Sequence, residues 1–486
     1  MTAQTVDHVS LLPLYAAAGT AVLVLLADLV VARRSAIFGA LVVGGLATAV
    51  CAIVVGGSRV GTFCAGASCS WVPSPLAMTA AVVFAGLTVG VLGLSVPSLR
   101  LGTAPAGEFC FLLACSMTGG VVVGYAGDLI TLIVGVETLT LPLYLLVGLR
   151  RFAPGEKVST ASASASVTFF LISVVSTAIA LLGAALNYAA TGALHLDRLI
   201  DGAGPFAPVA DAGVALLVIG LAFKVAAVPL HAWAPATYEG APLPVAAYLS
   251  TASKLGGVLA LAAIVSRVDA AALTGVLAVL TMTVGNLVAL RQTRMVRLLA
   301  WSSIAQAGYI LAALALGAAG VAAAAAYSVF FVVLELVAFG VVVALRAPGA
   351  DGGSLLAYRG AGRRSPWLGA ALVLAFAGLA GLPPGLAGLF AKVTVVDALI
   401  DNGHGWLAGV VALNAVIGLA YYVRVSALLY TKAEAPGISV VDPALLEAAT
   451  HPRLPVPRVV GFVLVAASLV AVALGFAPQL LFDALV

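Results

Sequence analysis

The feature that most constrains this chain is a series of apolar runs, each long enough to cross a membrane as a helix. About 20 apolar residues span the roughly 30 Å of hydrocarbon in a bilayer, and about fourteen such runs are present. Of the 486 residues, 63% are hydrophobic and only 9% are charged. The composition therefore predicts an all-α, polytopic integral membrane protein rather than a soluble helical bundle. The runs centre near residues 22, 46, 87, 117, 139, 175, 219, 254, 280, 307, 333, 380, 417 and 470.

The basic residues test this count, because Lys and Arg concentrate in cytoplasmic loops. With the N-terminus outside, Lys224, Lys254 and Lys392 lie within the runs and the other basic residues separate into two sets. The inside loops hold Arg33, Arg34, Arg100, Arg150, Arg151, Lys157, Arg291, Arg294, Arg297, Arg346, Arg359, Arg363, Arg364, Arg424, Lys432, Arg453 and Arg458, and the outside loops hold Arg59, Arg198 and Arg267. A miscounted run would mix the sets, so we predict a cell-membrane protein with both termini on the outer side.

The loops give little sign of a cofactor. Cys64 and Cys69, in "TFCAGASCSW", fall in a predicted outside loop, where an oxidising compartment would permit a disulfide. The sequence favours neither the disulfide nor two free thiols. No cysteine or histidine cluster has the spacing of a zinc, haem or iron–sulfur site. The net charge of +4 follows from the loop bias. We therefore predict no metal, no cofactor and no nucleic-acid partner for this chain.

Two runs are interrupted by proline. The seventh carries Pro229 after Lys224, and the twelfth, "GLAGLPPGLAGLFAK", carries a double proline before Lys392. Broken helices at corresponding places in two halves are typical of inverted-repeat transporters. Runs four to eight form one set of five helices and runs nine to thirteen form another, and the broken helix is the fourth of each set. Because five is an odd number, the second set enters the membrane with the opposite orientation. The predicted division is 1–107 for the first three helices, 108–266 and 267–431 for the two repeats, and 432–486 for an inner loop and the last helix.

Four ionisable residues are predicted near the middle of the bilayer. At 1.5 Å per residue, Glu137 lies about 14 Å along its run, and Lys224 and Lys254 about 16 Å along theirs. An unbroken helix would carry Lys392 about 36 Å, beyond the membrane. Lys392 returns to the middle only if the helix unwinds near residues 381–388.

Such residues suit a proton relay. A charge at mid-bilayer costs at least about 2.5–3.5 kcal/mol and normally lines a bundle interior or a wet path. Burial favours the neutral form of a lysine, and a nearby carboxylate favours its protonated form. Such a lysine can therefore gain or lose its proton as its surroundings change. Structural ion pairs or snorkelling side chains are the alternative. Two residues are secondary candidates. His231 could take part in the relay or only complete the end of its helix, and Glu335 could take part in the relay or be a hydrogen-bonded interior carboxylate.

Three stretches carry a family resemblance. "FKVAAVPLHAWAPATYEGAPLPVAAYLSTASKLGG", "GNLVALRQTRMVRLLAWSSIAQAGY" and "FAGLAGLPPGLAGLFAK" resemble the antiporter-like membrane subunits of respiratory complex I. The "YEGAP" stretch and a lysine on the twelfth helix are most similar to the subunit N family of NADH:quinone oxidoreductases. The resemblance covers roughly residues 108–430.

The resemblance implies a proton-pumping subunit. It implies that Glu137, in "GVETLTLPLY", and Lys224 form a coupling pair, that Lys254 is the central relay and that Lys392 exchanges protons with the other side. It also implies partner membrane and peripheral subunits that hold FMN, iron–sulfur clusters and quinone. The chain departs from the family pattern at Ala236, Val296 and Glu335, where aspartate, lysine and asparagine are usual.

Two other functions stay open at this point. A subunit of a multisubunit sodium/proton antiporter would share the core and its lysines. A purely structural assembly subunit would not transport ions, although four mid-membrane ionisable residues argue against it. No nucleotide-binding glycine-rich loop or nucleophile–base pair predicts catalysis by the chain alone.

Overall fold

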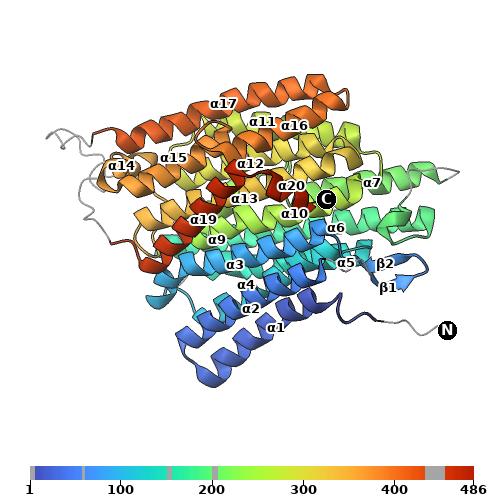
Figure 1. Ribbon diagram of the computed structural model, residues 1–486, viewed down its shortest axis with the longest axis horizontal. Coiled ribbons are helices and arrows are strands. Elements are labelled where there is room, and N and C mark those ends of the chain that lie inside the picture. Colours follow the sequence, from blue (N-terminus) through green and yellow to red (C-terminus); the bar gives the residue numbers. More distant parts are fainter. Residues whose placement is uncertain (1–5, 57–60, 150–155, 200–205, 433–454, 486) are drawn as a thin grey trace.

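The computed structural model describes residues 6–56, 61–149, 156–199, 206–432 and 455–485, with the side chains of 156–159 left out. Regular structure in this part is helical apart from one hairpin, and the long helices run side by side (Figure 1). Most of the predicted inner loop at the start of 432–486 lies outside the described residues. An all-helical arrangement is what a bilayer requires, because each helix satisfies its own backbone hydrogen bonds.

Eleven of the described helical spans are long and apolar enough to cross a membrane. They are α1 with its π-helical end η1 (Leu12–Leu26, Ala27–Val31), α2 (Arg34–Val55), α3 (Pro75–Arg100), α4 (Ala106–Tyr125), α5 (Leu129–Gly148), α6 (Glu156–Thr191), the continuous α9–η4–α10 (Leu243–Tyr248, Leu249–Ser253, Lys254–Val265), α11 (Ala271–Ala289), η5 with α13 (Gly317–Gly320, Val321–Leu345), α17 (Gly405–Tyr430) and α19 (Arg458–Phe476).

Three further elements complete the predicted set. The helix α12 (Met295–Leu314) has the length but carries several polar side chains. The helices α7 (Ala207–Ala222) and α15 (Pro366–Ala380) are short because each is interrupted. With these three, the described residues hold the fourteen crossing elements that the sequence predicted.

A disulfide-bonded hairpin lies at one end of the bundle. Strands β1 (Thr62–Ala65) and β2 (Ser68–Trp71) pair antiparallel, and Cys64 lies opposite Cys69 and forms a disulfide with it. The hairpin meets the loop after α6, where Arg198 Nε donates a hydrogen bond of 2.9 Å to Ser68 Oγ. The short helices η3 (Leu196–Arg198) and α20 (Gln479–Leu485) also lie at this end. The loops predicted to lie outside therefore gather together.

The opposite end carries most of the basic residues. Arg34 donates to the carbonyl of Arg100, and Arg363 donates to that of Tyr430. The short helices η6 (Leu355–Tyr358) and α14 (Ala361–Arg364) lie here, at the left of Figure 1. These contacts join loops that were predicted to share the inner side. Arg59, Arg150, Arg151, Arg453 and the side chain of Lys157 fall outside the described residues.

Two crossings are almost enclosed by the rest of the chain. In α9–η4–α10, 94% of the most apolar stretch is buried, and in the crossing that contains α13 the share is 83%. The corresponding share is 22% for both α1 and α19, which therefore expose most of their apolar surface. The enclosed pair carries Lys254 and Glu335, so these residues lie in the protein interior rather than against lipid.

Each predicted repeat contains one interrupted helix. After α7 the chain unwinds over residues 223–232 and resumes as α8 (Trp233–Gly240). After α15 it unwinds over residues 381–385 and resumes as α16 (Leu386–Asp401). The second break was predicted at 381–388 and ends three residues earlier. The boundaries of the two repeats stay a prediction.

The second interruption depends on glycine, which predicts a matched pair of variants. A Cβ on Gly388 would overlap the carbonyl oxygen of Gly378, whereas a Cβ on Gly409 in α17 would meet no atom within 4 Å. Overpacking costs about 1–3 kcal/mol. We expect Gly388→Ala to lower the thermal midpoint of the detergent-solubilised protein and Gly409→Ala to leave it unchanged. Equal midpoints would contradict the close approach of α15 and α16.

Candidate functional site

Lys224 lies in the unwound segment itself. The helix α7 ends at Ala222, two residues before it, and Ala226 takes a left-handed conformation with φ of +58°. The amide of Val228 then donates a hydrogen bond of 2.9 Å to Thr281 Oγ1 on α11. Side chains of a neighbouring helix thus satisfy backbone groups that the break releases, as a membrane interior requires.

The Lys224 ammonium has three partners. Its Nζ lies 2.8 Å from Glu137 Oε1, 2.8 Å from Ser173 Oγ and 3.3 Å from Thr140 Oγ1. Three N–H groups meet three oxygen acceptors, which is the full capacity of an ammonium. Thr177 Oγ1 donates a further hydrogen bond of 2.6 Å to Glu137 Oε1. The structure therefore brings together Glu137 and Lys224 as the resemblance implied.

The two members of this pair differ in exposure. The side chain of Lys224 is 3% exposed, whereas that of Glu137 is 27% exposed. Glu137 therefore forms the outer face of the pair on α5, and Lys224 lies behind it. A charge that approaches this face acts on the carboxylate first and on the ammonium through it.

Lys254 is held in a different environment. It is 2% exposed and directly follows the π-helical turn η4. Single π turns inside helices are frequent at functional sites. Within the described part of the chain, Lys254 Nζ has no hydrogen-bond partner. Such an ammonium would be costly, so its proton depends strongly on charges nearby.

Lys392 is bound by the interruption of its own helix. It is 8% exposed, and its Nζ donates a hydrogen bond of 2.5 Å to the carbonyl of Leu379 near the end of α15. Gly381, with φ of +82°, ends that helix beside the lysine side chain. The last carbonyls of a helix have no intrahelical donor and carry partial negative charge. The predicted break thus supplies an acceptor for Lys392.

A network of uncharged side chains surrounds Lys392. Gln306 Nε2 donates to the same Leu379 carbonyl at 2.9 Å and to Tyr422 at 3.1 Å. Tyr327 donates to Gln306 Oε1 at 2.6 Å. The Lys392 Nζ also lies 5.1 Å from the centre of the Tyr309 ring, within cation–π range. Among the described residues, no carboxylate forms an ion pair with Lys392.

The sequence reasoning missed these uncharged partners. Ser173 and Thr177 are four residues apart on α6, and Gln306 lies on α12 one turn from Ser302 and Ser303. The available signal was that polar residues inside an apolar run share a helical face.

His231 lies in the first interruption but apart from the lysine. Its ring centre is 5.1 Å from that of Trp301, and its Nδ1 has no partner in the described part of the chain. The hydrogen bonds of the Lys224 ammonium do not include it. A relay role for His231 stays a prediction.

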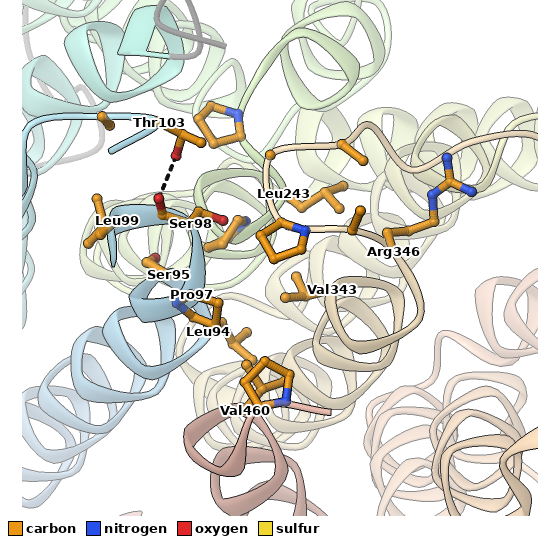
Figure 2. Close-up of a pocket in the computed structure, with 18 of the residues that line it drawn as sticks. Leu94, Ser95, Pro97, Ser98, Leu99, Thr103, Leu243, Val343, Arg346 and Val460 are labelled. Carbon is orange, nitrogen blue, oxygen red and sulfur yellow. Dashed lines mark hydrogen bonds between the residues drawn. The ribbon is translucent and has the colours of Figure 1, made fainter. Parts of the chain in front are cut away.

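A cavity of about 240 Å³ lies away from these groups. The ends of α3 and α13 and the start of α19 enclose it, with Leu94, Leu243, Val343 and Val460 on its walls (Figure 2). The Arg346 guanidinium at its rim bonds to the Asp351 carbonyl at 3.0 Å. None of the four predicted relay residues lines it. Within the described residues, no group of three or more His, Cys, Asp or Glu side chains is placed to hold a metal ion.

Comparison with known proteins places this geometry in a family. Residues 126–418 match the family model described as "NADH:quinone oxidoreductase/Mrp antiporter, TM". NADH-quinone oxidoreductase subunit N of Salinispora tropica is 59% identical, with 99% of this chain and 98% of that protein covered.

Solved structures agree with this assignment. A chain of respiratory complex I from Thermus thermophilus, solved with bound aureothin, is 27% identical with a TM-score of 0.77, and 97% of this chain and 98% of that chain are covered. A chain of the Mrp complex from Dietzia sp. is 20% identical with a TM-score of 0.83 and coverage of 98% and 96%, which shows a shared fold. The chain belongs to the NADH:quinone oxidoreductase/Mrp antiporter family, in its subunit N branch of antiporter-like membrane subunits.

Proposed function

We propose that this chain is a proton-translocating membrane subunit of an NADH:quinone oxidoreductase in the cell membrane. Protons pass through Glu137, Lys224, Lys254 and Lys392 while partner subunits carry out the redox chemistry. The FMN, the iron–sulfur clusters and the quinone belong to those partners. The observation that carries the proposal is the Glu137–Lys224 ion pair at a helix interruption, in a chain 59% identical to a subunit N.

The first step acts on the ion pair. Two unit charges 4 Å apart interact by about 4 kcal/mol at an effective dielectric of 20, so their separation has a large effect on proton binding. Glu137 is the more exposed partner, so a field change in a neighbouring subunit reaches it first. When the carboxylate moves away or is neutralised, Lys224 loses the charge that favours its protonated form. The Lys224 proton then becomes available for transfer.

The later steps use the two enclosed lysines. The proton moves towards Lys254, which has no hydrogen-bond partner of its own in the described chain. It then moves towards Lys392, which a carbonyl of the second interruption holds. Carbonyl dipoles stabilise an ammonium without a full counter-charge, so this site binds a proton without trapping it in an ion pair. Lys392 exchanges the proton with the outer side.

The two alternatives have weaker support. The likeness to the Mrp chain is 20% in sequence and concerns the fold, whereas the 59% identity is to a subunit N. A sodium/proton antiporter would show sodium-dependent transport in vesicles that lack NADH. A purely structural subunit would keep normal proton-to-electron stoichiometry when all four relay residues are neutralised. Identification of the copurifying subunits separates the main proposal from the antiporter.

Removal of the coupling lysine tests the relay. We expect Lys224→Ala to reduce NADH-driven proton pumping at least tenfold in membrane vesicles that contain the assembled complex, because the coupling pair is lost. The control is Lys432→Ala, which removes an exposed lysine at the end of α17. Dye quenching measures pumping, and NADH oxidation with an artificial acceptor measures assembly. Intact pumping in an assembled Lys224→Ala complex would defeat the proposal.

Paired neutral variants test whether Glu137 and Lys224 act as a unit. Removal of one partner of a buried pair costs about 3–5 kcal/mol, and the exposure of Glu137 reduces this by solvent screening. We expect Glu137→Gln to lower the thermal midpoint and the double variant Glu137→Gln, Lys224→Met to recover part of it. Pumping should be lost to a similar extent in the single and double variants, because residues that act together are not additive. Additive losses would argue against a unit.

Sidedness is tested with introduced cysteines. We propose that the hairpin end faces the outside, where Cys64 and Cys69 meet oxidising conditions. In right-side-out vesicles, a membrane-impermeant maleimide should label Asn402→Cys in the loop between α16 and α17. Lys432→Cys should be labelled only after permeabilisation, and the unmodified chain sets the background. The reverse pattern would invert the orientation.

A further inference from the structure

Four polar atoms without partners lie on the adjoining helices α8, α10, α12 and α13. Lys254 Nζ, Glu335 Oε2, Tyr238 OH and Ser303 Oγ are all buried, and none has a hydrogen-bond partner in the described part of the chain. Such groups are rare in native proteins. The ion pair of Glu137 and Lys224 does not use any of them. Their shared location therefore needs its own explanation.

The Glu335 carboxyl is placed towards Lys254. Glu335 is fully buried on α13, and Ser250 Oγ donates a hydrogen bond of 2.8 Å to its Oε1. Ser250 precedes Lys254 by four residues, so both lie on one side of the same crossing. The helix α13 packs against both η4 and α10, which carry these two residues. The Ser250 hydrogen bond and this packing place the Glu335 carboxyl beside the crossing that carries Lys254.

The helix that carries Glu335 also reaches the network of the second interruption. Tyr327 of α13 donates a hydrogen bond of 2.6 Å to Gln306 Oε1, and α13 packs against α16, which carries Lys392. Gln306 donates a hydrogen bond to Tyr422, and Gln306 shares the Leu379 carbonyl with Lys392. The helix α13 therefore connects a lysine without a hydrogen-bond partner to the side chains that surround the next lysine.

We propose that Glu335 accepts the proton of Lys254 and passes it towards Lys392. Transfer converts an ammonium and a carboxylate into an amine and a carboxylic acid, and the second step restores the carboxylate as the Lys392 amine becomes an ammonium. No oxidant or second reactant is needed. This inference rests on the proposed relay and adds a carboxyl step to it, at a position where the family usually has asparagine.

Two properties of the site suit this step. The Oε2 atom has no competing donor in the described chain, so it is free to take a proton. The Ser250 hydrogen bond holds Oε1 and thereby fixes the direction of Oε2. A static ion pair, the structural alternative, would keep Glu335 ionised throughout turnover. The two roles differ in whether a protonated carboxyl ever forms.

The first experiment compares pumping in the assembled complex. We expect Glu335→Gln, which keeps the shape of the side chain, to lower proton pumping at least fivefold and to leave NADH oxidation by an artificial acceptor unchanged. The control is Ser328→Ala on the same helix, since Ser328 bonds to the Ala324 carbonyl of its own helix. Unchanged pumping in Glu335→Gln overturns the proposal.

Infrared difference spectroscopy separates a proton carrier from a structural partner. During NADH-driven turnover, the complex should show a carbonyl stretch of a protonated carboxyl group that is missing in Glu335→Gln and present in Ser328→Ala. Its presence at full strength in Glu335→Gln overturns the proposal, even if pumping falls. Should Glu335→Gln fail to assemble, Ser250→Ala gives the same test. That band should then move to higher frequency, because the carboxyl accepts one hydrogen bond fewer, and an unmoved band overturns the proposal.

The outcomes also separate this inference from the proposed function. If Lys224→Ala and Lys392→Ala abolish pumping while Glu335→Gln does not, the relay stands and the carboxyl step is wrong. If the lysine variants pump normally, the proposed function itself fails.

Discussion

The energetic cost of an ammonium group inside an apolar bundle is the constraint on which this structure depends. A lysine away from water is stable only if acceptors or a counter-charge replace the solvent, or if it gives up its proton. The three lysines differ in this respect. Lys224 has a carboxylate and two hydroxyl groups, and Lys392 has a helix-end carbonyl. Among the described residues Lys254 has no hydrogen-bond partner, and its helix packs against the one that carries Glu335.

The helix interruptions follow from the same constraint. The carbonyls of a continuous helix already accept backbone N–H groups, whereas a broken helix leaves those of its last turn without such donors. The break after α15 releases the carbonyl of Leu379, which both Lys392 and Gln306 use. The break after α7 places Lys224 on unwound backbone, within reach of Glu137 on α5 and Ser173 on α6. Irregular backbone is tolerated at this depth because neighbouring helices surround it.

Much of this arrangement could be predicted from the sequence because the bilayer limits the possibilities. The length of apolar runs predicted the crossings, and the position of arginines predicted which loops meet. A depth calculation predicted the break before Lys392, since a continuous helix would place it outside the membrane. The motif resemblance predicted the pairing of Glu137 with Lys224.

The remaining contacts depend on how helices rotate about their axes, which an apolar run does not specify. A run that is apolar all round has no polar face to orient it, so the approach of Gln306 to Tyr422 or of Ser250 to Glu335 was not predictable. The family resemblance identified Glu335 as a departure from the usual asparagine. Its burial beside Ser250 shows that the carboxyl is accommodated by a specific donor.

The balance of enclosed charges explains why such a chain can move protons at all. The proposed relay contains three buried lysines and two carboxylates, Glu137 and Glu335, so this set of groups is neutral when both carboxylates are ionised and only two lysines are protonated. When all three lysines are protonated, one ammonium has no carboxylate as a counter-ion. Repulsion between the positive charges then favours release of a proton whenever another proton enters the relay. Glu137 pairs with Lys224 and is the more exposed member of that pair. Glu335 lies on α13, which packs against both α10 with Lys254 and α16 with Lys392. In the proposed relay, a shift of its proton therefore changes the charge balance at both lysines.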